Sequence, residues 1–311
     1  MKIVIVGPGA MGCLFAGLLS KQKGKHEIWL LDKRAERARK IKESGVAIEG
    51  LTNTKHHINI TSDSKLIGVS ELVMISTKSY DTESGLSSIR PLLSDATNIL
   101  SLQNGIGNSQ LISDIFGQDR TVCGITSHGA TLISDGRVKH AGKGDTVIGK
   151  PNGKIFRDLR NISNVFNEAG ISTKTSKDIN SVLWSKLIIN TGINPLSAIC
   201  RLPNGLLLKY EGIKELMRQA VVEATKVAKK SKVKLIYDDP LAKVESVCLA
   251  TSDNISSMLQ DILNQRRTEI DFINGAISRY AKSTGIKTPV NDMIVDIVRA
   301  IEASYKEQVG I

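Results

Sequence analysis

The sequence predicts an α/β fold in which an N-terminal doubly wound parallel sheet is followed by an all-helical C-terminal domain. Three observations support this fold class. A glycine-rich loop joins an apolar run to a helical pattern at the start of the chain, apolar runs alternate with helical stretches through the first third, and strand signals disappear after about residue 177. We therefore expect two domains, residues 1–177 and 178–311.

The first strand and the first helix enclose the most informative motif. Residues 2–6 are a short β-branched run typical of a buried strand, and residues 13–19 have the small and apolar pattern of a helix. Between them Gly7, Gly9 and Gly12 follow the order G-x-G-x-x-G. Such a turn aims the first N–H groups of the helix at one point, where the missing side chains admit a pyrophosphate and the helix dipole favours its charge.

The second strand strengthens the case for a dinucleotide site. Residues 28–31 form an apolar run that ends in Asp32, twenty positions after Gly12, which is the context of a Rossmann-type cofactor motif. A glycine turn in some other α/β sheet is the alternative. The residues expected to bind the cofactor lie in the loop and at the strand end, and are Gly7, Pro8, Gly9, Ala10, Met11, Gly12, Asp32, Lys33 and Arg34.

The rest of the first domain continues the alternation. Residues 46–61 are expected to form two short extended pieces, and residues 120–150, punctuated by Asp-Gly, Ala-Gly and Lys-Gly pairs, are expected to form antiparallel hairpins. The other expected elements are strands at residues 72–76, 98–102 and 171–175 and a helix at residues 155–169.

The second domain is predicted to be helical, with apolar residues at helical spacing over residues 182–193, 213–229, 241–250, 264–282 and 293–304. In the first of these helices Lys186, Asn190 and Asn194 are spaced i, i+4, i+8, so they project from one face within an arc of about 80°. Because burying them unpaired is costly, this face is either a ligand site or a solvated polar stripe. The residue before a proline avoids helical geometry, so we expect Asn194, which precedes Pro195, to lie at a kink in this helix.

Composition limits the classes of function. The formal net charge is +11, but the basic residues are dispersed and aromatic residues make up only 4%, so we expect no nucleic-acid partner. The four cysteines form no C-x-x-C pair and the five histidines have no metal spacing, which favours reduced thiols and no metal site. With no signal peptide and no apolar run of about 18–20 residues, we expect a cytoplasmic protein without membrane contact.

Two blocks of the second domain resemble the ketopantoate reductases (2-dehydropantoate 2-reductases). Residues 186–195, Lys-Leu-Ile-Ile-Asn-Thr-Gly-Ile-Asn-Pro, are similar to that family's K-x-x-x-N-x-x-x-N-P helix. Residues 254–275 resemble its S-S-M-x-Q-D…R-x-T-E-I-D-x-I-N-G signature, which is long and varied enough to make chance agreement improbable. The resemblance extends over the whole chain.

The resemblance implies a role for each matching residue. Lys186 resembles the general acid that protonates the ketone oxygen, and Glu269 resembles the acidic residue beside that lysine and the cofactor. Lys78 and Asn104 are similar to residues that reach the nicotinamide half and the substrate, and Ala130 is similar to a cofactor contact. The implied substrate-binding residues are Asn104, Lys186, Asn190, Asn194, Asn204, Asn254 and Ser257.

The implied function is reduction of 2-dehydropantoate to (R)-pantoate, in pantothenate and coenzyme A biosynthesis, with the active site in the cleft between the domains. The partner is then a small-molecule 2-keto acid, and a homodimer is left open. The alternatives are a reductase of another 2-keto or β-hydroxy acid, and a nucleotide-sensing protein without catalysis. The intact Lys186 argues against the sensor, which has no need of a proton donor.

The choice of cofactor rests on three neighbouring residues. The resemblance favours NADP(H), and Lys33 and Arg34 would clamp a 2′-phosphate. Family members often carry an arginine at the end of this strand, whereas this chain has Asp32. An acid there usually binds the ribose 2′-hydroxyl, which leaves NAD(H) open unless Lys33 or Arg34 draws the carboxylate aside.

Overall fold

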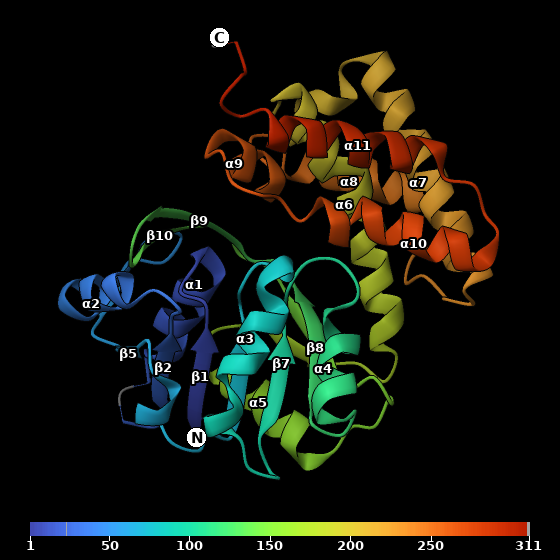
Figure 1. The fold of residues 1–311 in the computed structure, drawn as a ribbon. Helices are drawn as coiled ribbons and strands as arrows, with labels where there is room; N and C mark the ends of the chain where they lie inside the picture. The colour runs from blue at the N-terminus through green and yellow to red at the C-terminus, as the bar shows by residue number, and fades with distance from the viewer. Residues whose placement is uncertain (23, 310–311) are drawn as a thin grey trace. The chain divides into compact units, whose positions relative to one another are not determined.

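The computed structural model describes residues 1–22 and 24–309, and the chain divides into two compact units (Figure 1). The first unit comprises Met1–Gln103 and Asn108–Ile179, and the second comprises Asn104–Gly107 and Asn180–Ile311. The first unit is α/β and the second is helical, so the predicted fold class is confirmed. Of the helices described, none is both long and apolar enough to span a bilayer.

Eight strands form the main sheet of the first unit, in the order β12-β11-β8-β7-β6-β1-β2-β5. Neighbouring strands are parallel except for β8 and β11. The chain leaves β1 toward β2 and β5 and later returns on its other side with β6, so the carboxyl end of β1 is the switch point at which such sheets bind ligands. The strands are β1 (Lys2–Val6), β2 (Glu27–Leu31), β5 (Asn59–Thr61), β6 (Leu72–Ile75), β7 (Asn98–Ser101), β8 (Thr121–Thr126), β11 (Thr146–Gly149) and β12 (Thr173–Thr175).

Alternating side chains of these strands fill two apolar cores. Ile3 and Ile5 pack with α1 and α5 on one face of the sheet, whereas Val4 and Val6 pack with α3 and α4 on the other. This period of two explains why strands buried on both faces read as continuous apolar runs. The helices and 3₁₀ turns of the first unit are α1 (Ala10–Leu19), α2 (Ala35–Ser44), η1 (Ser64–Leu66), η2 (Ser79–Asp81), α3 (Thr82–Ser88), η3 (Arg90–Leu92), α4 (Asn108–Phe116) and α5 (Arg157–Glu168).

A smaller sheet, in the order β4-β3-β10-β9, contacts α1. It contains β3 (Val46–Gly50), β4 (Thr54–His56), β9 (Gly129–Ser134) and β10 (Arg137–Gly142). The prediction of two extended pieces over residues 46–61 is wrong in number, because three strands form there: β3 and β4 join this sheet, and β5 joins the main one. The predicted hairpins over residues 120–150 are correct only for β9 and β10. The strands β8 and β11 are antiparallel but belong to the main sheet, and β10 also pairs in parallel with β3.

The second unit packs its helices around a core that includes Trp184, Leu187 and Met217. Its helices are α6 (Ile179–Cys200), η4 (Asn204–Leu208), α7 (Glu211–Lys230), α8 (Pro240–Ala250), α9 (Ser257–Leu263), η5 (Ile270–Phe272), α10 (Asn274–Thr284) and α11 (Pro289–Ala303). The helix predicted over residues 264–282 is wrong in its first half, since α9 ends before it and Gln265 has a φ of 51°. Ile270 and Ile277 both enter the core, which maintains helical spacing across the break.

The helix α6 continues through Pro195, so Asn194 lies within a helical segment. Proline has no N–H, so the carbonyl oxygen of Thr191 lacks its usual donor from four residues ahead. The Nδ2 of Asn274 in α10 donates to this oxygen at 3.3 Å and to Oδ1 of Asn291 in α11 at 3.0 Å. One buried amide therefore replaces the lost backbone bond and joins three helices.

Candidate active site

The glycine loop between β1 and α1 has the geometry that the sequence predicts. Gly7 has a φ of +93°, and a Cβ there would lie 2.9 Å from the backbone nitrogen of Thr77. A Cβ on Gly12 would collide with the carbonyl oxygen of Gly7. The N–H of Gly7 donates to the carbonyl of Leu31 at 2.9 Å, which fixes the loop against the end of β2.

The loop leaves room for a phosphate group in front of α1. A Cβ on Gly9 would meet no atom within 4 Å, and no side chain caps the helix at this residue. The first helical N–H groups, which belong to Ala10, Met11 and Gly12, have no intrahelical acceptor. The first turn of α1 carries no acidic residue, so nothing there repels an anion. These features fit the pyrophosphate of a dinucleotide.

The carboxylate of Asp32 is buried and engaged by Arg37. Its two oxygens accept hydrogen bonds from Nε and Nη2 of Arg37, the latter at 2.7 Å, and Oδ1 also accepts from the N–H of Arg34 at 3.1 Å. The side chain of Lys33 instead pairs with Asp81 at 3.0 Å. The expectation that Lys33 or Arg34 would draw Asp32 aside is therefore corrected, because the side chain of Arg37 does so.

The other residues predicted to contact the cofactor come from different elements. Lys78 lies at the start of η2, directly after β6, and Ala130 lies in β9 of the smaller sheet. Asn104 belongs to the second unit, where Gly105 approaches the carbonyl of Phe272 so closely that a Cβ would collide with it. Gly105 has a φ of +83°, so both its conformation and its surroundings require glycine.

Lys186, Glu269 and Asn104 come together in the second unit. The Nδ2 of Asn104 donates to Oε2 of Glu269 at 3.4 Å, and Glu269 is buried. Burial lowers the pKa of Lys186 to about 8, while the nearby charge of Glu269 acts in the opposite direction. A lysine with a pKa near 8 is both protonated near neutral pH and able to release its proton, as a general acid must.

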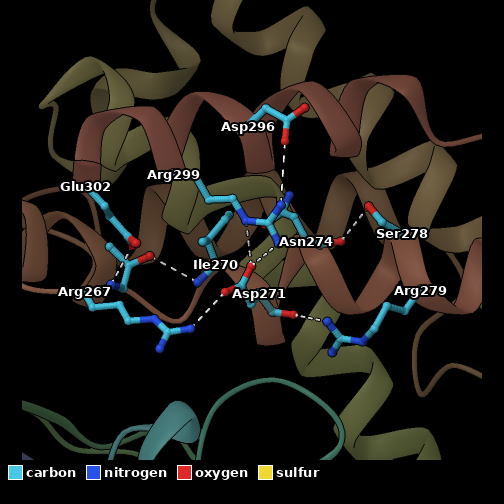
Figure 2. Close-up of polar contacts among 10 residues, drawn as sticks. Arg267, Ile270, Asp271, Asn274, Ser278, Arg279, Asp296, Arg299 and Glu302 are labelled. Atoms are coloured by element: carbon cyan, nitrogen blue, oxygen red, sulfur yellow. Dashed lines mark hydrogen bonds and ion pairs between the residues drawn. The ribbon is translucent and has the colours of Figure 1, made fainter. Parts of the chain in front are cut away.

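The residues on both sides of Glu269 contact α10 and α11, and Figure 2 shows the contacts of Asp271 with Arg279 and Arg299. Before Glu269, the N–H of Thr268 donates to Glu302 of α11 at 2.7 Å. After it, the carboxylate of Asp271 accepts hydrogen bonds from Arg299 at 2.7 and 3.0 Å, and its carbonyl accepts from Arg279 at 2.7 Å. These contacts fix the backbone on both sides of Glu269, including the start of η5.

The asparagines of α6 lie where the spacing puts them. Lys186 and Asn190 are half-buried, and Asn194 is buried. The carbonyl of Asn194 accepts a hydrogen bond from the hydroxyl of Ser256 at 3.3 Å, which connects α6 to the start of α9. A stripe this enclosed is not the solvated polar face that spacing alone left open.

The remaining predicted substrate residues lie on two adjoining segments. The backbone N–H of Asn204 donates to the carbonyl of Asn254 at 2.9 Å, and its Nδ2 donates to Thr251 at 2.9 Å. Its Oδ1 is buried without a hydrogen-bond partner among the residues described. Asn254 is exposed, and Ser257 is the first residue of α9.

Sequence reasoning missed two residues of the site. Ser256, not Ser257, caps α9, because its hydroxyl accepts the N–H of Leu259 at 3.0 Å. A serine just before an apolar helical run is a cap signal, but the two adjacent serines made it ambiguous which of them caps the helix. For Arg37 the only signal was its position in the first turn of a helix that follows Asp32.

Comparisons of sequence and structure identify the family. The family described as Ketopantoate reductase PanE/ApbA matches residues 3–153, and its C-terminal part matches residues 178–302. A 2-dehydropantoate 2-reductase from Pyrococcus horikoshii is 37% identical over 97% of this chain and 98% of its own length. One from Vibrio cholerae is 31% identical over 99% of this chain and 100% of its own length.

Two solved structures are similar over their whole length. A PanE/ApbA family ketopantoate reductase from Ralstonia eutropha JMP134 has a TM-score of 0.90 and 31% identity, and the match covers 99% of this chain and 100% of that one. D-mandelate dehydrogenase with NADH and anilino(oxo)acetate has a TM-score of 0.92 and 31% identity, and the match covers 98% of this chain and 100% of that one. With two family matches and full-length relatives, the chain belongs to the ketopantoate reductase family.

Proposed function

We propose that the protein reduces 2-dehydropantoate to (R)-pantoate with NADPH, a reaction of pantothenate and coenzyme A synthesis. The observation that carries this proposal is the cluster of Lys186, Glu269 and Asn104 in a chain of this family. Full-length relatives named 2-dehydropantoate 2-reductase support the same activity. A protein that only senses a nucleotide needs no half-buried lysine with a pKa near 8.

The chemistry follows from where charge develops. A nicotinamide dinucleotide, whose pyrophosphate the glycine loop before α1 would hold, would supply the hydride, and negative charge would develop on the ketone oxygen as it is reduced. Lys186 stabilises this oxygen and donates its Nζ proton to it. Glu269 holds the lysine in its charged form before the reaction and orients it. Asn104, held by Glu269, is placed to orient the substrate carbonyl.

The substrate is bound by polar groups that frame this cluster. On α6, Asn190 and Asn194 lie one and two helical turns beyond Lys186 and would take the hydroxyl group of ketopantoate. Asn204, with its unpaired Oδ1, and Ser257 would bind the remaining polar groups of the substrate, including its carboxylate. A site built to satisfy hydrogen bonds discriminates strongly against substrates that lack the matching groups.

The surroundings of Asp32 support NADPH rather than NADH. The carboxylate is covered and paired with Arg37, so it does not face the cofactor as a free anion. Lys33, Arg34 and Arg37 together with Asp32 and Asp81 leave a net charge of +1 at the end of β2. A positive balance favours the 2′-phosphate.

A second candidate is the NADH-dependent interconversion of a 2-hydroxy acid that carries an aromatic group and its 2-keto acid. The likeness to D-mandelate dehydrogenase, which was solved with NADH, favours it. That likeness in fold and identity equals the likeness to a ketopantoate reductase, so fold alone does not distinguish the substrates.

Steady-state turnover tests both candidates. The purified protein is assayed with ketopantoate and with phenylglyoxylate, each with NADPH and with NADH, and kcat/KM is compared across the four combinations. We expect ketopantoate with NADPH to give the highest value. A higher kcat/KM for phenylglyoxylate with NADH would replace the first proposal by the second.

A further inference from the structure

The Asp32 carboxylate has no exposed oxygen for a ribose hydroxyl. Its side chain is only 1% exposed, and both oxygens accept hydrogen bonds from Arg37. Oδ1 accepts a third bond from the N–H of Arg34. An acid that receives the ribose of NADH must present an oxygen toward the cofactor, and this one is turned to α2 instead.

Arg37 lies between Asp32 and the surface. It is the third residue of α2, in the turn where helix N–H groups and the helix dipole favour an anion. Its guanidinium uses Nε and Nη2 to bind Asp32 and is 16% exposed, and no hydrogen bond involves Nη1 in the part of the chain that the structure describes. The donors of Nη1 are therefore available to a ligand.

The end of β2 is next to the phosphate loop. The N–H of Gly7 donates to the carbonyl of Leu31, the residue that precedes Asp32. The side chain of Lys33 is paired with Asp81 at 3.0 Å. Arg34 is exposed at the N-terminal boundary of α2, so Arg34 and Arg37 flank the position that a cofactor ribose takes beside this strand.

We infer that Arg37 binds the 2′-phosphate of the cofactor and that Asp32 is its positioning residue. The acid at the end of β2 thus orients Arg37, five residues later in the chain, instead of binding the ribose. The guanidinium, fixed on one edge by a buried carboxylate, loses little freedom when its other edge binds phosphate. This inference rests on the proposed use of NADPH, and it adds the residue that determines that preference.

Calorimetric titration with 2′,5′-ADP and with 5′-AMP tests the inference without a keto acid or turnover. The wild-type protein is expected to bind 2′,5′-ADP about tenfold more tightly or better. Arg37→Gln is expected to lose most of this difference while the affinity for 5′-AMP changes less than about threefold. The control is Arg39→Gln, which removes the same charge from an exposed position of α2 and should leave both affinities within about threefold.

Arg37→Gln leaves Asp32 buried without its partner, which endangers folding. The double variant Asp32→Asn/Arg37→Gln removes both charges together, and the same loss of 2′-phosphate preference is expected. Equal weakening of both nucleotides in these variants, or an unchanged preference for 2′,5′-ADP, would overturn the role of Arg37.

A separate variant tests the role of Asp32. Asp32→Asn is expected to leave the affinity for NADH within about threefold, because the carboxylate does not touch the ribose. A larger loss would show that Asp32 binds the ribose hydroxyls and would overturn the inference. A protein that binds 2′,5′-ADP through Arg37 but does not reduce ketopantoate would keep this inference while the proposed reaction fails.

Discussion

In the first unit the candidate site is made mainly of backbone, whereas in the second it is made of buried side chains. The glycine loop offers N–H groups and empty space: Gly7 and Gly12 are required by close contacts or by φ, whereas a Cβ on Gly9 would meet no protein atom within 4 Å. The second unit offers the side chains of Lys186, Asn190, Asn194 and Glu269, of which the first two are half-buried and the last two buried. The proposed function accounts for the difference, because a phosphate is recognised by backbone amides and a keto acid by groups of specific chemistry.

This comparison also explains why the two sites differ in how they tolerate change. Backbone recognition fails when any side chain is added, whatever its chemistry. Side-chain recognition fails when the chemistry is removed, even if the shape is kept. The predictions below test this contrast between the units.

The largest effect is expected from Lys186→Ala. Loss of the proton donor should lower kcat by about 10²–10⁴-fold, because the alkoxide then forms without a charge or a proton beside it. Binding of the cofactor, measured by fluorescence quenching, should change less than about threefold, since the glycine loop belongs to the other unit. A variant that keeps more than about a tenth of the wild-type kcat would remove Lys186 from the chemical step.

Gly12→Ala and Gly9→Ala distinguish a clash inside the protein from a side chain that blocks only the space for the cofactor. In Gly12→Ala the Cβ collides with the carbonyl of Gly7, so both the free energy of unfolding, by about 1–3 kcal/mol, and cofactor affinity should fall. In Gly9→Ala nothing lies within 4 Å of the Cβ, so stability should stay within about 0.5 kcal/mol while affinity still falls. Chemical denaturation and cofactor titration give the two quantities. Unchanged affinity in Gly9→Ala would show that the pyrophosphate does not approach this residue.

The pH dependence of kcat should report Lys186. Its pKa of about 8 means that the donor is protonated below pH 8 and lost above it, so the rate of ketone reduction should fall about tenfold per pH unit above that value. Oxidation of the hydroxy acid needs the neutral lysine and should rise toward pH 8. In Glu269→Gln the charge that raises the lysine pKa is gone, so the break should move to lower pH. A break that stays in place would mean that another group is titrating.

The smallest effects are expected from two neighbouring serines with different tasks. Ser256→Ala removes the cap of α9 and should lower the free energy of unfolding by about 1 kcal/mol. Ser257→Ala should leave stability within about 0.5 kcal/mol and raise KM for the keto acid more than it lowers kcat. Denaturation curves and steady-state kinetics on both variants make the comparison. Equal behaviour of the two variants would contradict the separation of cap and ligand contact.

The sequence predicted the first unit better than the second because its signals are local. The order of strand, G-x-G-x-x-G and helix occurs within nineteen residues, and its geometry is as expected. In contrast, Ile270 and Ile277 share a helical spacing across a segment that is not one helix, because both pack into the same core. Packing into a shared core therefore produces a helical spacing of apolar residues even where the backbone is not one continuous helix.

Pairings between distant residues were the least accessible to sequence reasoning. The position of Asp32 was predicted, but its partner Arg37 depends on the angle at which α2 leaves β2. The smaller sheet joins β3 to β10 across most of the first unit, and no local pattern specifies that parallel pair. The resemblance to the ketopantoate reductases predicted which residues belong to the candidate site. The contacts that orient those residues could be described only from the structure.

The amide that replaces the missing backbone bond of Pro195 has a consequence for biosynthesis. The carbonyl of Thr191 finds its donor in Asn274, 83 residues later in the chain. While the protein is being made, α6 with its lysine and asparagines emerges from the ribosome long before that donor exists. This bond can therefore form only after α10 has been translated and has docked, so a chain truncated before Asn274 leaves one carbonyl in the middle of α6 without that donor.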